Sequence, residues 1–114
     1  MKKQYRLKRN EDFQKVISKK RNLANASFAA YFYPNNLGHA RIGISVSVKL
    51  GKAVVRNKIK RQVRMMVLQA VDLSKSADFI FIVRKRYLNK TFEENLKALQ
   101  ELSAKIMFKL DKEV

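Results

Sequence analysis

A basic stretch from Ala53 to Arg64 has the residue types that bind phosphate groups. It holds five lysines and arginines within nine positions and no acidic residue. On a helix, at 100° per residue, its apolar and polar side chains fall on two adjoining arcs. The apolar arc comprises Val55, Ile59, Val63, Met66 and Ala70, and the polar arc comprises Arg56, Asn57, Lys60, Arg61 and Arg64. Guanidinium groups bind phosphate oxygens in pairs, and asparagine can bind a base edge or a sugar. We therefore expect a helix that buries one side and presents its cations to a polyanion.

A second group of side chains has the chemistry to stack on nucleic-acid bases. Phe13 and Ile17 lie one turn apart on a predicted helix, and Tyr31 and Tyr33 share one face of a predicted strand. The other face of that strand carries Phe28, Ala30 and Phe32. A base stacked on an aromatic side chain contributes roughly 1–3 kcal/mol to binding. Two interpretations stay open: one strand face forms a cleft for single-stranded bases, or all of these side chains belong to the core.

The charge distribution indicates what kind of partner the chain has. The 114 residues carry a net charge of +17, and they suffice for one domain, residues 1–114. Between Phe13 and Val71 there are twelve lysines and arginines but no aspartate or glutamate. A merely solvated surface usually mixes both signs, so this segregation favours a binding surface for phosphates. The sequence predicts a single nucleic-acid-binding domain.

Residues for self-sufficient catalysis are scarce. The only histidine, His39, lies where a turn meets a strand, there are no cysteines, and no two acids have the spacing of a general acid–base pair. We therefore expect no catalytic residue and no metal site on the chain. No apolar run reaches the roughly 18 residues of a membrane span, and the charged start leads into no signal segment. These features favour a cytoplasmic protein without a membrane partner.

Periodicity and capping signals predict three helices and three strands in the order α-β-β-α-β-α. Asn10 is the predicted N-cap of the first helix, and Thr91 with Glu94 forms a predicted capping box before the last. The predicted helices cover residues 10–20, 53–72 and 92–110, and the predicted strands cover residues 28–33, 39–48 and 78–84. We expect the first two strands to form an antiparallel hairpin and the third to lie at the centre of the sheet. Residues 1–9 form a basic segment that is expected to be partly extended, and its charge density favours folding coupled to anion binding.

Taken together, these residues resemble the protein subunit of bacterial ribonuclease P. The matching segments are Tyr5-Arg6-Leu7-Lys8-Arg9-Asn10-Glu11-Asp12-Phe13, Ala24-Asn25, Arg41-Ile42-Gly43-Ile44-Ser45-Val46-Ser47 and Gly51-Lys52-Ala53-Val54-Val55-Arg56-Asn57-Lys58-Ile59-Lys60-Arg61. The last segment, following the serine-containing strand, is the most specific of the four. Lys58 stands where the family commonly has arginine.

The resemblance implies an α+β fold with one more strand than the periodicity predicts. Its order is α-β-β-β-α-β-α, a single-domain sandwich in which a mixed four-stranded sheet packs with helices. It also implies a left-handed βαβ crossover through the basic helix, as in the ribosomal protein S5 domain 2-like fold. A bend near Gly43 or Gly51 could supply the extra strand by splitting the second predicted strand.

The resemblance also implies a role for this chain in tRNA maturation. A partner RNA is expected to be the catalyst that removes the 5′ leader of precursor tRNA, with Mg²⁺ held mainly by RNA. The residues expected to bind the catalytic RNA are Lys52, Arg56, Asn57, Lys58, Lys60, Arg61 and Arg64. Phe13, Ile17 and Tyr31 are expected to form the cleft for the leader. The chain departs from the family at Ile17, where an aromatic is frequent, and at Ala26 and Val48, where a basic residue is common.

One alternative has the same charge pattern. A structural RNA-binding protein of the ribosome or its assembly would also be basic, but it would have no substrate-binding role. Such a protein is not expected to distinguish RNA with a 5′ leader from RNA without one.

Overall fold

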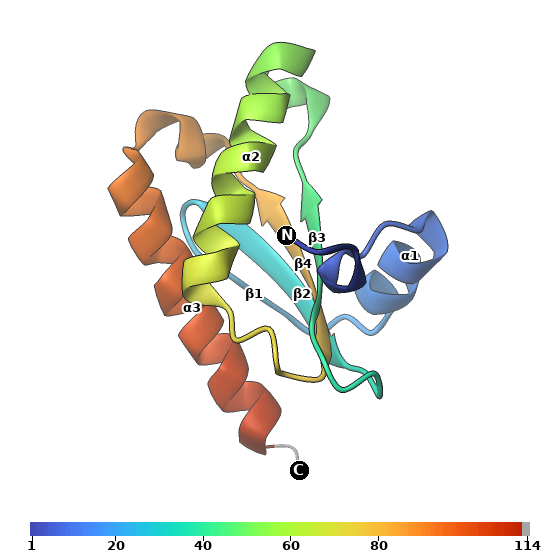
Figure 1. The fold of residues 1–114 in the computed structure, drawn as a ribbon. Helices are drawn as coiled ribbons and strands as arrows, with labels where there is room; N and C mark the ends of the chain where they lie inside the picture. Colours follow the sequence, from blue (N-terminus) through green and yellow to red (C-terminus); the bar gives the residue numbers. More distant parts are fainter. Residues whose placement is uncertain (113–114) are drawn as a thin grey trace.

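A computed structural model describes residues 1–112, which form three α-helices around a four-stranded sheet (Figure 1). The helices are α1 (Asn10–Ser18), α2 (Ala53–Ala70) and α3 (Phe92–Lys112). The strands are β1 (Asn22–Ala24), β2 (Phe28–Pro34), β3 (Arg41–Ser45) and β4 (Ala77–Val83), and three short 3₁₀ helices are η1 (Lys3–Tyr5), η2 (Val48–Leu50) and η3 (Lys85–Asn89). Within these residues, no helix is both long enough and apolar enough to cross a membrane.

The strand order in the sheet is β1-β2-β4-β3. β2 pairs antiparallel with β1 and with β4, whereas β3 pairs parallel with β4. The first two predicted strands correspond to β2 and β3. Their predicted hairpin is wrong, because β4 lies between them. Every residue of β4 except Ile82 is buried, and only a central strand covered on both faces can bury its side chains in this way.

The connection from β3 through α2 to β4 is left-handed, as the resemblance implied. In Figure 1, α2 lies in front of the sheet, β3 and β4 point upward, and β4 lies to the left of β3. Connections between parallel strands are right-handed in about 98% of cases. The crossover places α2 across one face of the sheet, where its apolar arc is buried and its polar arc faces outward.

One face of the sheet is closed by α2 and α3. Phe28, Phe32, Phe79 and Phe81 point into this face and are at most 1% exposed. From α2, Ile59, Val63, Met66 and Val67 join them, and from α3, Leu99, Leu102, Ile106 and Leu110. The predicted apolar arc of α2 is thus confirmed at its centre, although Val55 at its start is exposed.

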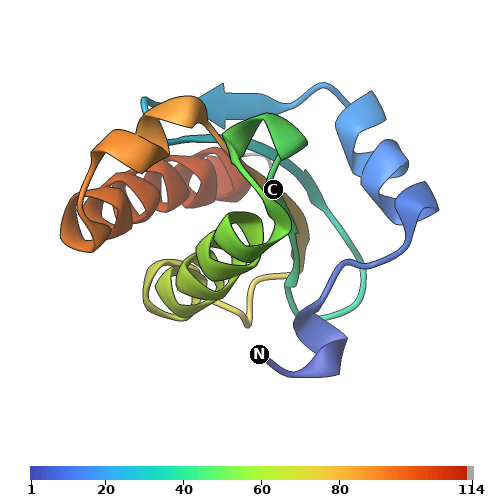
Figure 2. The same cartoon turned by 90° about the horizontal axis from the view of Figure 1, so that it is seen from above.

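The opposite face is covered only by α1 and the N-terminal segment (Figure 2). Leu7, Val16 and Ile80 are the buried residues of this smaller cluster. The segment before α1 follows the edge of β3: the amide of Leu7 donates to the carbonyl of Ile42 at 2.9 Å. The basic residues 1–9 are therefore placed against β3 through Leu7.

Several predicted boundaries differ from the observed ones. The additional strand is β1, which precedes β2, so it does not arise from a bend at Gly43 or Gly51. With three residues, β1 is too short to show an alternating pattern. The second predicted strand, residues 39–48, is β3 and ends at Ser45. The chain then turns into η2, where the side chain of Ser47 accepts a hydrogen bond from the amide of Lys49.

The helix starts were predicted with mixed success. The capping box of α3 is confirmed, with the Glu94 carboxylate accepting from the Thr91 amide at 2.9 Å and the Thr91 hydroxyl accepting from the Glu94 amide at 3.2 Å. The N-cap of α1 is wrong by one residue: Arg9 occupies that position, without a side-chain cap, and Asn10 is already helical.

Candidate nucleic-acid interface

The polar arc of α2 forms a basic surface whose side chains are exposed or partly exposed. Its centre is a shallow hollow of about 500 Å³ lined by Val54, Asn57, Lys60, Arg61 and Arg64. Within residues 1–112, the only basic residues in ion pairs are Arg41 and Lys75. No carboxylate in this range therefore neutralises a cation of α2. Unpaired cations on a rigid helix are well suited to phosphate groups, because binding releases counterions without first breaking a protein salt bridge.

The other predicted residues of this surface lie around its rim. The Arg56 side chain turns back toward the start of the helix, where its Nε donates to the Gly51 carbonyl at 3.1 Å. Lys52 occupies the N-cap position of α2, and Lys58 is exposed. At 100° per residue, Lys58 lies on the flank of the helix that faces away from Lys60. The structure thus brings four of the seven predicted residues together.

The predicted aromatic cleft lies on the face of the sheet that α1 covers. We call this the open face, and the face under α2 and α3 the closed face. Phe13 and Ile17 from α1 and Tyr31 from β2 are half-buried and pack against the cluster of Leu7, Val16 and Ile80. The ring of Phe13 lies directly on β3, because a Cβ added at Gly43 would come within 2.4 Å of its Cζ atom. Glycine at position 43 is therefore what lets the ring approach the strand. Each of these side chains contacts the core and keeps an exposed portion, and the binding of bases here stays a prediction.

The two predicted surfaces meet at the edge of β3. A hollow of about 310 Å³ is lined both by Phe13 and by Lys60 and Arg64. The N-terminal segment completes it with Arg6 and Lys8. The sequence predicted two separate surfaces, but the edge strand between them is narrow enough for α1 and α2 to share one basic rim.

Further cations surround Tyr33 at the far end of the open face. Lys19 Nζ lies 5.0 Å from the centroid of the Tyr33 ring, and the Arg21 guanidinium carbon lies 5.6 Å from it. Such cation–π contacts hold long side chains beside the ring. A hollow of about 390 Å³ between α1 and the turn after β2 opens here, with Lys15 and Lys19 on its α1 wall.

A third basic group was not predicted from the sequence. Arg84, Lys85 and Arg86 follow β4 and line a hollow of about 440 Å³ together with Ala26 and Asn89. Ala26 is one of the positions at which the resemblance implied a basic residue, and here Arg84, Lys85 and Arg86 line the same hollow as Ala26. With Lys90, four of the seven residues 84–90 are basic, which is the sequence signal that could have identified this group. Val48, the other such position, is 72% exposed on η2.

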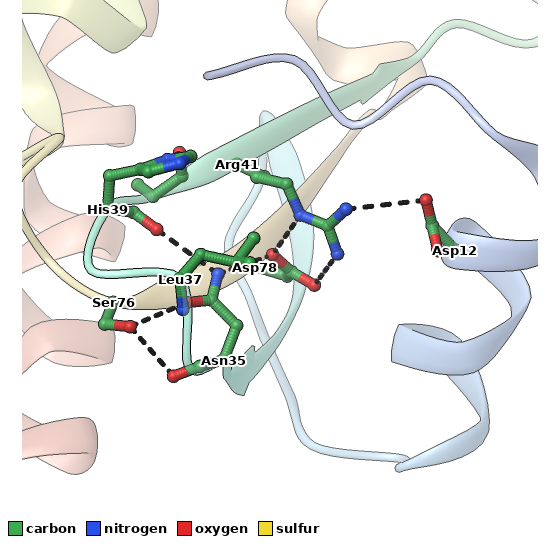
Figure 3. A network of polar contacts seen from close by, with 8 residues as sticks. Asp12, Asn35, Leu37, His39, Arg41, Ser76 and Asp78 are labelled. Carbon is green, nitrogen blue, oxygen red and sulfur yellow. Dashed lines mark hydrogen bonds and ion pairs between the residues drawn. The ribbon is translucent and has the colours of Figure 1, made fainter. Parts of the chain in front are cut away.

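Arg41 is fixed in a polar network at the start of β3 (Figure 3). Its Nε and Nη2 donate to the two carboxylate oxygens of Asp78 at 2.9 and 2.8 Å, and its Nη1 lies 3.5 Å from Asp12 Oδ2. The hydrogen bond to Asp78 raises the pKa of Arg41 above its usual value, so the guanidinium stays charged. Asp78 is only 7% exposed, so we assign this ion pair a structural role.

The described residues offer no metal site of protein ligands. Within residues 1–112, no three histidine, cysteine, aspartate or glutamate side chains gather as metal ligands would. The two carboxylates nearest the cleft, Asp12 and Asp78, both face Arg41. His39 lies edge-on to the Tyr5 ring, with its Nδ1 2.9 Å from the Ala40 carbonyl oxygen. Residues 1–112 therefore show no set of side chains that fits a resident magnesium ion.

Comparison with known proteins identifies the family. The sequence profile of the ribonuclease P protein family matches residues 1–107. The chain belongs to this family. The ribonuclease P protein component of Bacillus velezensis is 46% identical over 106 residues, covering 92% of this chain and 91% of that protein.

Solved structures agree with this assignment. The ribonuclease P protein of Staphylococcus aureus matches with a TM-score of 0.77 and 39% identity, over 90% of this chain and 94% of that one. The protein from Thermotoga maritima matches with a TM-score of 0.77 and 30% identity, over 86% and 94% of the two chains. Membership in the ribonuclease P protein family makes this chain a subunit of an endoribonuclease that contains an RNA subunit.

The structure explains two of the segments that carried the resemblance to the ribonuclease P protein family. Asn25 fixes the turn between β1 and β2: its Oδ1 accepts from the amides of Ser27 and Phe28, and its Nδ2 donates to the Ala98 carbonyl of α3 at 2.9 Å. Gly43 makes room for Phe13 on β3. These residues shape the scaffold, whereas Lys58 and Arg61 of α2 are exposed to solvent.

Proposed function

We propose that this chain binds the catalytic RNA of ribonuclease P through α2 and holds the 5′ leader of precursor tRNA in the cleft beside α1. The observation that carries the proposal is the basic surface of α2, which has no carboxylate partner within residues 1–112 and continues to Phe13 at the edge of β3. One polyanion on α2 and a second strand in the cleft would then lie side by side, with protein cations between them.

The chemistry of leader removal is assigned to the RNA in this proposal. The chain would screen the repulsion between catalytic RNA, leader and tRNA, which tightens substrate binding and lowers the magnesium concentration that the reaction needs. RNA-held Mg²⁺ would supply the Lewis acid and the activated water. The scarcity of acid–base residues near the cleft supports this division. The complex is expected to act in the cytoplasm.

Reconstitution tests the proposal directly. The purified chain is added to the catalytic RNA with labelled precursor tRNA at low magnesium concentration. We expect cleavage at the 5′ end of the mature sequence to be stimulated, and no cleavage by the protein alone. Cleavage by the protein without RNA would overturn the assignment of the chemistry to the RNA.

A matched pair of double variants tests the role of α2. Lys58→Ala with Arg61→Ala removes two exposed cations from α2, and Lys97→Ala with Lys105→Ala removes two from the exposed side of α3. If about six phosphates are engaged, the log–log salt slope of binding to the catalytic RNA is near −4 to −5. The α2 variant should flatten the slope by about 1.5 and weaken binding, while the α3 variant changes little. Equal losses in both variants would show that total charge, and not α2, determines binding.

A comparison of two RNA substrates tests the cleft. Phe13→Ala and, separately, Tyr31→Leu should weaken the binding of precursor tRNA by the holoenzyme more than that of mature tRNA, because only the precursor carries a leader. Loss of one stacked base corresponds to about 1–3 kcal/mol. A structural RNA-binding protein of the ribosome or its assembly, the alternative function, would bind both RNAs alike. Equal losses for both RNAs would assign Phe13 to the core and favour that alternative.

A further inference from the structure

A line of charged side chains joins α1 to the centre of the sheet. Asp12 in the first turn of α1 faces Arg41 of β3, which in turn pairs with Asp78 of β4 (Figure 3). The Arg41–Asp78 contact has two hydrogen bonds, at 2.9 and 2.8 Å, whereas the Asp12–Arg41 contact is a single one at 3.5 Å. The weak Asp12–Arg41 pair therefore connects α1 to the strong Arg41–Asp78 pair.

The strong pair is held in place from a third side. Asn35 Nδ2 donates to Asp78 Oδ1 at 2.8 Å, and Ser76 Oγ lies 2.7 Å from Asn35 Oδ1. Bidentate arginine–carboxylate contacts fix the plane of the guanidinium group. With Nε and Nη2 engaged by Asp78, the guanidinium of Arg41 presents Nη1 to α1 in a fixed direction. Arg41 thus acts as a fixed contact point for Asp12.

The position of Asp12 is unusual for a surface that would bind phosphates. Its side chain is 30% exposed, at one end of the α1 wall that also carries Lys15 and Lys19. A carboxylate there repels a phosphate backbone, so on electrostatic grounds alone it lowers affinity for RNA. Asp12 also directly precedes Phe13, and Phe13 packs on Gly43, two residues beyond Arg41 in β3. The ion pair and the ring contact therefore join the same turn of α1 to the same strand.

We propose that the Asp12–Arg41 ion pair positions α1 on the sheet and thereby sets where Phe13 lies in the leader cleft. In this view Asp12 is a positioning residue: its benefit to substrate binding, through the placement of Phe13, exceeds the electrostatic cost of its negative charge. The inference rests on the proposed leader-binding function of the cleft, and it adds the element that determines the shape of the cleft.

The direction in which one substitution changes the affinity for precursor tRNA distinguishes a positioning role of Asp12 from a purely electrostatic one. Asp12→Asn removes one negative charge and the ion pair, and Glu11→Gln removes one negative charge from the preceding residue, which is exposed and forms no ion pair in the described residues. Both changes alter the first turn of α1 and its dipole interaction equally. By charge alone, both variants should bind precursor tRNA more tightly than the wild type. Positioning predicts that Asp12→Asn weakens precursor binding by about two- to fivefold, the range of exposed ion pairs.

The measurement is the ratio of affinities for precursor and mature tRNA, in holoenzyme reconstituted with each variant. We expect this ratio to fall for Asp12→Asn and to stay unchanged for Glu11→Gln. Asp12→Glu, which restores the carboxylate, should recover part of the loss. Thermal unfolding of each free protein provides the control for folding, and we expect similar midpoints because the Asp12 side chain is partly solvated.

A double-mutant cycle shows whether Asp12 acts through Phe13. If it does, Asp12→Asn in a Phe13→Ala background should produce no further change in the affinity ratio. If Phe13→Ala alone leaves the ratio unchanged, the proposed leader cleft fails. If Phe13→Ala lowers the ratio but Asp12→Asn behaves like Glu11→Gln, or its effect adds fully to that of Phe13→Ala, the cleft stands and the positioning role of Asp12 fails.

Discussion

The two faces of the sheet differ in how completely they are covered. On the face under α2 and α3, the four phenylalanines of β2 and β4 are at most 1% exposed, and both helices contribute continuous apolar rows. On the face under α1, the buried cluster of large apolar side chains is limited to Leu7, Val16 and Ile80, while Phe13 and Tyr31 stay half-exposed. Both faces belong to the same strands, with side chains that alternate along β2.

This difference predicts that the closed face determines the stability of the fold and that the open face is available for binding. The closed face supplies most of the buried apolar area, so the free energy of folding depends mainly on it. Because α2 is held by its buried side, its opposite side can carry unpaired cations without unfolding the helix. The open face contributes less to stability, and its aromatic side chains are therefore available to a ligand. Four experiments test this division, from the largest expected effect to the smallest.

Truncation of a phenylalanine on the closed face should be the most damaging change. Phe81→Ala removes a fully buried ring and should lower the free energy of unfolding by about 3–5 kcal/mol. Tyr31→Ala on the open face should cost no more than about 2 kcal/mol, because its ring is already half-exposed. Urea denaturation of both variants gives the two values. Equal costs would contradict the division between the two faces.

Loss of Arg41 should be the costliest polar change on the open face. Arg41→Met leaves the buried carboxylate of Asp78 with Asn35 as its remaining side-chain partner. We expect a loss of about 1–3 kcal/mol in the free energy of unfolding, less than for a fully buried pair because Arg41 is partly exposed. The combined variant Arg41→Met with Asp78→Asn should recover part of this loss, as judged by urea denaturation. A single variant as stable as the wild type would mean that the network contributes no stability.

A methyl group at position 43 should affect binding more than stability. Gly43→Ala would place Cβ 2.4 Å from Phe13 Cζ, so the ring must move away from β3. Because the ring can shift toward solvent, we expect a cost of only about 1 kcal/mol in the free energy of unfolding. The affinity for precursor tRNA relative to mature tRNA should fall as for Phe13→Ala. A stability loss as large as that of Phe81→Ala would show that this face is packed as tightly as the closed one.

The smallest effect is expected at the margin of the closed face, at high pH. Burial raises the pKa of Tyr87 from its ordinary value of 10.0 to about 12. The folded state thus favours the neutral phenol, whose contribution to stability is complete below pH 10.0 and is lost as the pH rises toward about 12.

Tyr87→Phe provides the test, because it removes the titrating group and keeps the ring. Urea denaturation should show the stability of the wild type falling relative to the variant over this pH range. All other ionisable groups are the same in the two proteins, so their effects on stability cancel in the difference. A difference independent of pH would mean that the hydroxyl, which donates to Gln62 Oε1 at 2.8 Å, is not protected from solvent.

Particular residues show which parts of the fold could be predicted from the sequence. The alternation in β2 correctly separated Tyr31 and Tyr33 from Phe28, Ala30 and Phe32. The helical spacing in α2 correctly placed Ile59, Val63 and Met66 on its buried side, but not Val55. These are local periodicities, which depend only on the geometry of one element. The capping box of Thr91 and Glu94 is local in the same sense. By contrast, β1 has three residues and no periodic signal, so it was missed.

The pairing of strands could not be predicted in the same way. Proximity in the chain suggested that β2 and β3 form a hairpin. The more apolar β4 lies between them instead, because the central position buries its side chains on both faces. The same holds for the contact of Phe13 with Gly43, for the hollow that Phe13 shares with Lys60 and Arg64, and for the line from Asp12 to Asp78. Each joins residues at least 29 positions apart, as for Asp12 and Arg41.

The sequence by itself determined the basic charge, the two-sided character of α2 and the chemical types of the residues on each surface. Net charge and periodicity follow from composition and spacing, whatever the arrangement of the elements. Only the tertiary structure decided which surfaces adjoin, because the order β1-β2-β4-β3 leaves β3 as a narrow edge with α1 on one side and α2 on the other. That order depends on which strand buries the most apolar surface, a property of the whole sheet and not of any one segment.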